Sequence, residues 1–173
     1  PSNPTGSWNS GEEIRRLHAA LPGHVLLVVD EAYAEYVTEP DWETSFGLAR
    51  DAANIVVTRT FSKIHGLGGL RIGFGYAPLK VAEAIDRIRL PFNVSLPGIE
   101  AAAAAITDEA HQRTSRELVD AWKPRLTQAL RGFGLCQDRP ERRQGHCACR
   151  LRSDVGAPCP HLTDSCIRSL TTP

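Results

Sequence analysis

The stretch Val25–Glu31, which reads VLLVVDE, is the clearest indication of the fold class of this chain. Five consecutive aliphatic side chains predict a strand that is covered on both faces, as in a parallel sheet, and the strand ends at two acidic residues. A helix is expected before it, because Ser10 and Glu13 have the three-residue spacing of a capping box and apolar residues follow at helical intervals. The chain therefore begins in a helix-then-strand order.

The remaining pattern up to residue 132 continues this alternation. Strands are predicted at 55–58 and 70–76, with a glycine-bearing loop between them, and helices at 79–90, 96–107 and 108–132. This order is typical of an α/β domain with a mostly parallel sheet flanked by helices. In such a domain ligands lie beyond the carboxyl ends of the strands, so the residues at those ends become the candidate site.

Composition excludes several classes of function. The 173 residues hold 20 Lys and Arg against 20 Asp and Glu, so the formal net charge is zero. A neutral chain has no general attraction to nucleic acid, and no apolar run approaches the roughly 18 residues of a membrane span. No nucleic-acid or membrane partner is expected. Without a visible secretory signal we expect a cytoplasmic protein, and a chain beginning with Pro1 is expected to lack its true beginning.

The last 38 residues differ sharply from the rest. They contain all five cysteines and no lysine or aromatic residue, and they show no helical or strand period. We therefore expect residues 136–173 to form a disordered tail. This composition is what a GC-rich gene gives when read out of frame, which is our hypothesis for the tail. Cys147 and Cys149 are too close in sequence for a zinc pair, so no metal site is predicted.

Chemically distinctive side chains follow the first two strands. Asp30 and Tyr33 come after the first, and Thr60, Ser62 and Lys63 end the second, with Arg71 eight residues further on. A lysine amine, a carboxylate, hydroxyls and a guanidinium are the groups that a phosphorylated pyridine aldehyde needs. The set indicates pyridoxal 5'-phosphate as cofactor. Taken singly, Asp30 would be read as a turn residue and Lys63 as a solvent-exposed loop residue.

Three motifs in this order resemble the fold-type I aminotransferases of classes I and II. They are NPTG at 3–6, DEAY at 30–33, and TFSK at 60–63 followed by GLRIG at 69–73. Within that superfamily, DEAYAEY at 30–36, RTFSK at 59–63 and RLPFNV at 89–94 are most similar to the histidinol-phosphate aminotransferases. The resemblance covers residues 1–135 and implies a partial large domain and the start of the small domain. In members of the family, roughly half of the chain precedes the position that corresponds to Pro1. No part of residues 136–173 resembles the small domain of the family.

The resemblance also implies a role for each site residue. Lys63 would bind the cofactor covalently and then move the substrate proton, and Asp30 would pair with the pyridine nitrogen. Asn3 and Tyr33 would hydrogen-bond the phenolic oxygen of the ring. The cofactor phosphate would be held by Thr60, Ser62 and Arg71. His65 is expected to be a surface histidine rather than a catalytic base.

The implied reaction is transamination between histidinol phosphate and 2-oxoglutarate, in histidine biosynthesis. Its partners would be a small amino donor and a 2-oxo acid, and the family implies a homodimer. Two alternatives stay open from the residues. One is a lyase like threonine-phosphate decarboxylase, which shares these motifs. The other is an incomplete product with weak or no cofactor binding.

Overall fold

The computed structural model describes residues 2–3 and 6–133 of the chain. Its elements in chain order are α1 (Gly11–Ala20), β1 (Leu27–Asp30), η1 (Ala34–Tyr36), α2 (Phe46–Asp51), β2 (Ile55–Thr60), η2 (Gly68–Leu70), β3 (Gly73–Tyr76), α3 (Leu79–Ile88), α4 (Leu96–Ile106) and α5 (Glu109–Gly132), where η marks a 3-10 turn. The predicted helices and strands are all present, with ends that shift by a few residues. The α/β alternation is therefore confirmed.

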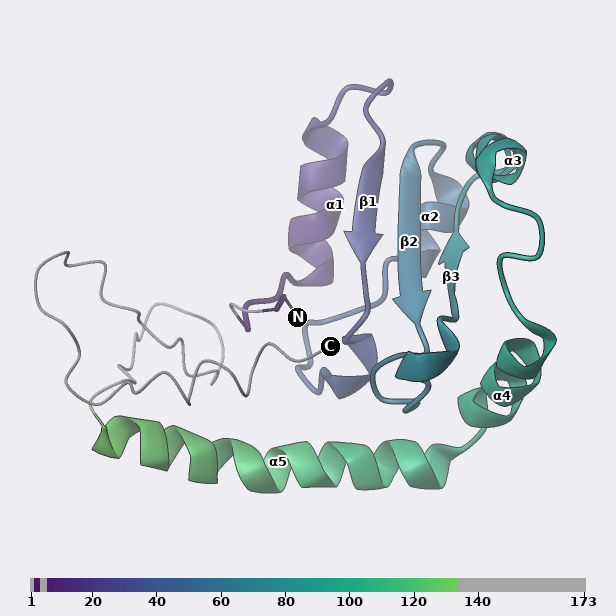
Figure 1. Cartoon of the computed structure of the whole chain (residues 1–173). Coiled ribbons are helices and arrows are strands. Elements are labelled where there is room, and N and C mark those ends of the chain that lie inside the picture. Colours follow the sequence, from purple (N-terminus) through teal and green to yellow (C-terminus); the bar gives the residue numbers. More distant parts are fainter. Residues whose placement is uncertain (1, 4–5, 134–173) are drawn as a thin grey trace, which may run out of the picture.

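The three strands form one sheet in the order β1-β2-β3. β1 and β2 are parallel, with Leu27 opposite Ile55, whereas β2 and β3 are antiparallel, with Thr60 opposite Gly73. The carboxyl ends of β1 and β2 point the same way, and α5 runs across below them (Figure 1). The loops that leave these two strands therefore lie between the sheet and α5.

Two small apolar clusters hold the sheet to its neighbours. Ile55, Val57 and Ala49 form one cluster between the sheet and α2. Phe61, Ile72 and Ala102 form the other, which joins the loop after β2 to α4. The first cluster thus holds the amino-terminal half of β2, where Ile55, Val56 and Val57 are buried, and the second holds the loop that leaves its carboxyl end.

The strand β1 is covered less than the sequence predicted. Leu27 and Val29 pack against the first cluster, but Val28 is 56% exposed on the opposite face. The expectation of a strand buried on both faces is wrong for this chain. Leu27 and Val29 face the cluster with α2, whereas Val28 belongs to neither apolar cluster of residues 2–3 and 6–133.

The strand predicted at 70–76 begins later than expected. Leu70 ends η2, and Arg71 follows in the left-handed backbone conformation with φ of 53°. Gly73 then starts β3, and a Cβ at this position would meet the Arg59 carbonyl oxygen at 2.6 Å. The backbone of β3 can approach β2 this closely because residue 73 has no side chain.

Side-chain caps are present at the starts of α1 and α4, close to the positions where the sequence predicted helices to begin. The Ser10 hydroxyl accepts from the backbone N–H of Glu13, and the Glu13 carboxylate accepts from the N–H of Ser10, so the capping box is confirmed. The Ser95 hydroxyl caps α4 by accepting from the N–H of Gly98. Such caps satisfy donors that a helix start otherwise leaves without a partner.

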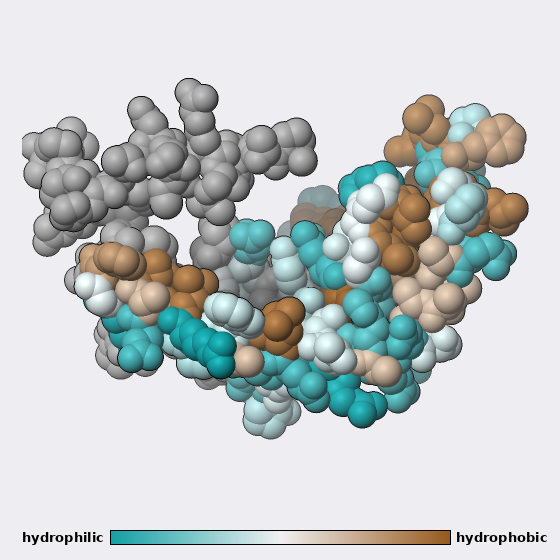
Figure 2. Space-filling model, turned by 60° about the horizontal axis from the view of Figure 1, so that its bottom comes forward, coloured by the Kyte–Doolittle hydropathy of each residue, from teal (hydrophilic) through white to brown (hydrophobic). Residues whose placement is uncertain are grey.

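Apolar side chains remain on the surface of the described part. The large exposed residues of α3 and α5 are Leu79, Ile85, Ile88, Leu118, Val119, Trp122 and Leu126. Figure 2 shows brown patches at opposite ends of the view. No helix of the described residues is both long and apolar enough to cross a membrane. The predicted tail at 136–173, with its cysteines, lies outside the described residues.

Candidate functional site

Three segments of the chain bring polar side chains together around Tyr33. Tyr33 lies between β1 and η1, and its hydroxyl oxygen accepts a hydrogen bond from Asn3 Nδ2 at 3.4 Å. The Lys63 Nζ atom lies 5.0 Å from the centre of the Tyr33 ring. The structure thus groups Asn3, Tyr33 and Lys63, which stand up to sixty residues apart in the sequence.

The phenol of Tyr33 is perturbed by this grouping. Hydrogen bonding to Lys63, and next to Asn3, lowers the pKa of Tyr33 below its ordinary value, while burial acts in the opposite direction. A donor that hydrogen-bonds an ionised oxygen stabilises the charged form. A change at Lys63 therefore alters the pKa of Tyr33.

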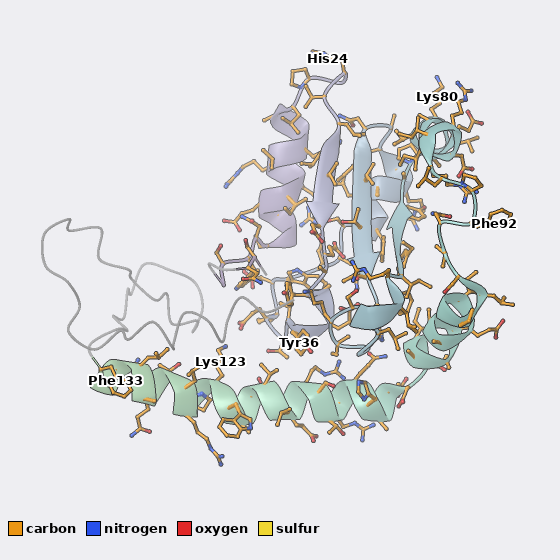
Figure 3. All side chains as sticks on the ribbon, in the orientation of Figure 1. His24, Tyr36, Lys80, Phe92, Lys123 and Phe133 are labelled. Atoms are coloured by element: carbon orange, nitrogen blue, oxygen red, sulfur yellow. The ribbon has the colours of Figure 1, made fainter. Side chains whose placement is uncertain are left out.

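Two adjoining hollows meet at these residues. The first hollow, of about 320 Å³, lies by the end of β1 and is lined by Asn3, Asp30 and Tyr33 among others. The second hollow, of about 470 Å³, is lined by Asn3, Tyr33 and Lys63 and reaches Lys123 of α5. Figure 3 shows Tyr36, another lining residue, on the segment that faces α5. The predicted catalytic lysine thus lies beside space that a small molecule could enter.

Asp30 lies at the end of β1, as the sequence indicated. Its Oδ1 atom accepts from the N–H of Ala32 at 3.0 Å, which is the turn-residue bond that the simpler interpretation predicts. Asp30 also lines the first hollow with Tyr33. The carboxylate consequently has a local structural role and a place in the candidate site at the same time.

The predicted phosphate-binding residues are placed differently. Thr60 Oγ1 accepts from the N–H of Ser62, which closes a small turn before Lys63. The Arg71 side chain is exposed, and its guanidinium donates to the Gly68 carbonyl at 2.8 Å. None of the three lines either of the two hollows around Tyr33. The described residues therefore gather the ring-side set more completely than the phosphate-side set.

The expectation that His65 is a surface histidine is wrong. His65 is 9% exposed, and its ring lies 5.0 Å from that of Phe61. Its Nε2 atom lies 4.0 Å from Glu35 Oε1, and its Nδ1 atom is buried with no hydrogen-bond partner among the described residues. The loop after β2 brings His65 against Phe61 and close to Glu35 of η1, which buries its ring.

Sequence reasoning missed a buried ion cluster next to the site. Arg59 of β2 binds Glu31 and Glu35, and its guanidinium lies over the Phe46 ring at 5.0 Å. A signal was present, because an arginine two residues after the buried Ile55–Val57 run must find a partner if its side chain is to stay inside. The identity of the partners could not be read from that signal.

Comparison with known proteins places this arrangement in a family. Residues 1–136 match the family described as aminotransferase class I and II. The chain belongs to this family, whose members use pyridoxal phosphate, and its fold is part of a fold-type I aminotransferase domain.

Curated relatives are more specific in name. The chain is 58% identical over 135 residues to histidinol-phosphate aminotransferase 1 of Caulobacter vibrioides. The aligned residues make up 78% of this chain and 38% of that protein. It is 50% identical over 135 residues to histidinol-phosphate aminotransferase of Rhodopseudomonas palustris, with 78% and 37% covered. The chain thus spans little more than a third of the length of the curated relatives it matches.

Solved structures agree with these relatives. The histidinol-phosphate aminotransferase of Sinorhizobium meliloti, in complex with pyridoxal-5'-phosphate, has a TM-score of 0.72 at 36% identity, over 78% of this chain and 36% of that one. The L-threonine-O-3-phosphate decarboxylase of Porphyromonas gingivalis has a TM-score of 0.66 at 25% identity, over 76% and 40%. The fold is shared by both, and the identity is higher to the aminotransferase.

Proposed function

We propose that this chain is part of a pyridoxal-phosphate-dependent histidinol-phosphate aminotransferase. The reaction converts histidinol phosphate and 2-oxoglutarate to imidazole acetol phosphate and glutamate. The observation that carries the proposal is the grouping of Lys63, Tyr33 and Asn3 beside two hollows, in a chain 58% identical to a protein of that name. The protein would act in the cytoplasm as a homodimer on small amino donors and 2-oxo acids.

The donor set present fits the cofactor at its ring end. Pyridoxal phosphate supplies an aldehyde that condenses with amines and a protonated ring that accepts electrons. Lys63 offers an exposed amine, and the Tyr33 phenol and Asn3 amide offer donors for the ring oxygen. Asp30, which lines the hollow with Tyr33, would hold the positive ring nitrogen by its carboxylate charge.

The phosphate end is proposed to involve Arg71, Thr60 and Ser62. Arg71 uses one nitrogen for the Gly68 carbonyl, which leaves the rest of a five-donor guanidinium for an anion. Thr60 and Ser62 offer hydroxyls on the turn just before Lys63. The amine, the phenol and the anion-binding groups would then all contact one ligand.

Lys63 is proposed as the residue that handles the proton. Its side chain is exposed, and its Nζ atom lies 5.0 Å from the centre of the Tyr33 ring. A lysine in this position acts as acid or base only when it is neutral part of the time. The Tyr33 hydroxyl would orient the amine between such transfers.

Covalent labelling tests this proposal. The full chain is mixed with pyridoxal phosphate, reduced with borohydride and mapped by peptide analysis. We expect saturable labelling of Lys63, abolished in Lys63→Ala and kept in Lys80→Ala, because Lys80 lies on α3 far from the hollows (Figure 3). Equal labelling of Lys63, Lys80 and Lys123 would refute a built cofactor site.

Turnover separates the proposed reaction from its alternatives. Glutamate formed from histidinol phosphate and 2-oxoglutarate supports the aminotransferase. Carbon dioxide released from threonine phosphate would instead favour the decarboxylase. Labelling of Lys63 with neither product would identify a chain that binds cofactor without completing the reaction.

A further inference from the structure

Arg59 lies at the centre of a buried cluster that the proposed roles do not use. Its Nε and Nη2 atoms bind Glu31 Oε2 at 2.9 and 2.7 Å, and its Nη1 atom binds Glu35 Oε1 at 2.7 Å. The side chains of Arg59, Glu31 and Glu35 are 14%, 6% and 18% exposed. A guanidinium that contacts two shielded carboxylates at this distance fixes both more firmly than a surface pair would.

Both carboxylates are held by further groups. Glu31 Oε1 accepts from the N–H of Ser45 at 2.6 Å, and Glu31 Oε2 accepts from the Thr44 hydroxyl at 2.8 Å. The backbone carbonyl of Glu35 accepts from Arg116 of α5 at 3.4 Å. The segment from Glu31 to Glu35 is therefore anchored at its two ends, to β2 and to neighbouring elements.

Tyr33 is the middle residue of that anchored segment. Arg59 itself stands four residues before Lys63, at the end of β2. One side chain thus joins the two segments that carry Tyr33 and Lys63. The hydrogen bond from Asn3 to Tyr33 and the approach of Lys63 Nζ to 5.0 Å from the Tyr33 ring centre need those segments in a fixed relative position.

We propose that Arg59 is a positioning residue, which clamps Glu31 and Glu35 so that the Tyr33 hydroxyl stays within reach of Lys63. Arg59 lines neither hollow, whereas Glu31 lines the first, so the effect of Arg59 itself falls on the position of Tyr33 rather than on a ligand. The inference rests on the proposed function for its catalytic meaning, but the coupling itself requires no cofactor. Loss of the clamp should release Tyr33 from Lys63 while the sheet stays intact.

The acidity of Tyr33 reports this coupling in the full chain without cofactor. In Glu35→Leu, removal of a negative charge alone would lower or leave unchanged the pKa of Tyr33, because repulsion of the phenolate decreases. Loss of positioning has the opposite sign, because the hydrogen bond from Lys63 is lost. We expect the pKa of Tyr33 to rise toward the ordinary tyrosine value of about 10.

Tyr36 serves as an internal control in the same titration. Burial first, and then the charge of Glu35, raise the pKa of Tyr36. In Glu35→Leu the pKa of Tyr36 should therefore fall while that of Tyr33 rises. Tyrosine-selective NMR follows each residue separately, and Tyr33→Phe assigns the signal.

Matched variants complete the experiment. Glu35→Gln keeps an acceptor for Arg59, so we expect Tyr33 to retain its lowered pKa. Arg50→Gln removes an exposed ion pair with Asp51 and should change nothing at Tyr33. If Glu35→Leu fails to fold, the triple variant Arg59→Met, Glu31→Gln, Glu35→Gln removes the cluster without leaving a buried charge, and the same rise is expected.

The sign of the shift decides the outcome. An unchanged or lowered pKa of Tyr33 in a folded variant, verified by circular dichroism and cooperative unfolding, overturns the positioning role. Because no cofactor is present, that failure is distinct from a failure to label Lys63. A rise in the pKa of Tyr33, together with the absence of cofactor labelling at Lys63, would support the positioning role of Arg59 and contradict the proposed function.

Discussion

At the scale of single residues, the pair Tyr33 and Lys63 is the most informative. The sequence placed both in the candidate site, but only the folded chain brings them close enough for one to change the acidity of the other. Lys63 is exposed, whereas the phenol of Tyr33 is half-buried between Asn3 and the lysine. This contrast makes Tyr33 the better spectroscopic probe.

Removal of the lysine should raise the pKa of Tyr33. In Lys63→Ala the largest cause of the lowered pKa is lost, so Tyr33 should ionise at higher pH than in the parent chain; Asn3→Ala should give a smaller rise. A tyrosinate absorbance titration measures both. A larger effect from Asn3→Ala would contradict this order.

The lowered pKa of Tyr33 also makes the free energy of unfolding depend on pH. Since folding lowers the pKa of Tyr33, its ionised form stabilises the fold only at alkaline pH, and the contribution is lost as pH falls through the folded pKa. The contribution is fully present only above the ordinary tyrosine pKa of about 10. Tyr33→Phe should destabilise the chain more at alkaline than at neutral pH, as measured by urea unfolding.

Arg71 combines a positive φ with a proposed anion contact. Arg71→Gly removes the guanidinium and suits the backbone φ of 53°, whereas Arg71→Gln removes the guanidinium and keeps the strain. We expect both variants to weaken pyridoxal phosphate binding by about 10-fold or more, the effect of losing a charge-assisted hydrogen bond. Titration of cofactor absorbance measures it. Normal affinity in Arg71→Gly would contradict a role of the guanidinium in binding.

At the scale of elements, the close spacing of β2 and β3 depends on the glycines of β3. Gly73→Ala would place a Cβ at 2.6 Å from the Arg59 carbonyl oxygen, whereas in Gly75→Ala the nearest atom lies at 3.9 Å. The first variant should lose about 1–3 kcal/mol of unfolding free energy and the second much less. Denaturant unfolding of the two compares them. Equal losses would mean that the strand spacing relaxes freely.

At the scale of the whole molecule, buried and exposed apolar residues should separate in their effects. Phe61 is 7% exposed within the second cluster, and Phe92 is 99% exposed with φ of 56°. Figure 3 shows the Phe92 side chain directed away from the body. Phe61→Ala should cost about 3–5 kcal/mol of unfolding free energy, and Phe92→Asn less than about 0.5 kcal/mol.

Surface hydrophobicity supplies the second readout of that comparison. The native chain should enhance the fluorescence of an apolar dye, because large apolar residues are exposed on α3, α5 and β1. Phe92→Asn should reduce that signal while leaving stability unchanged. A chain that binds no dye would indicate that these faces are covered in solution.

Sequence patterns were sufficient to predict the element order, the capping box at Ser10, and the candidate residues Asp30, Tyr33 and Lys63. These features depend on local spacing and on side-chain chemistry, which the linear pattern contains. The exposure of Val28, the burial of His65 and the ion pairs of Arg59 with Glu31 and Glu35 became visible only in the folded chain. Burial and ion pairing depend on which segments pack together, and residues 28 positions apart meet only after the chain has folded.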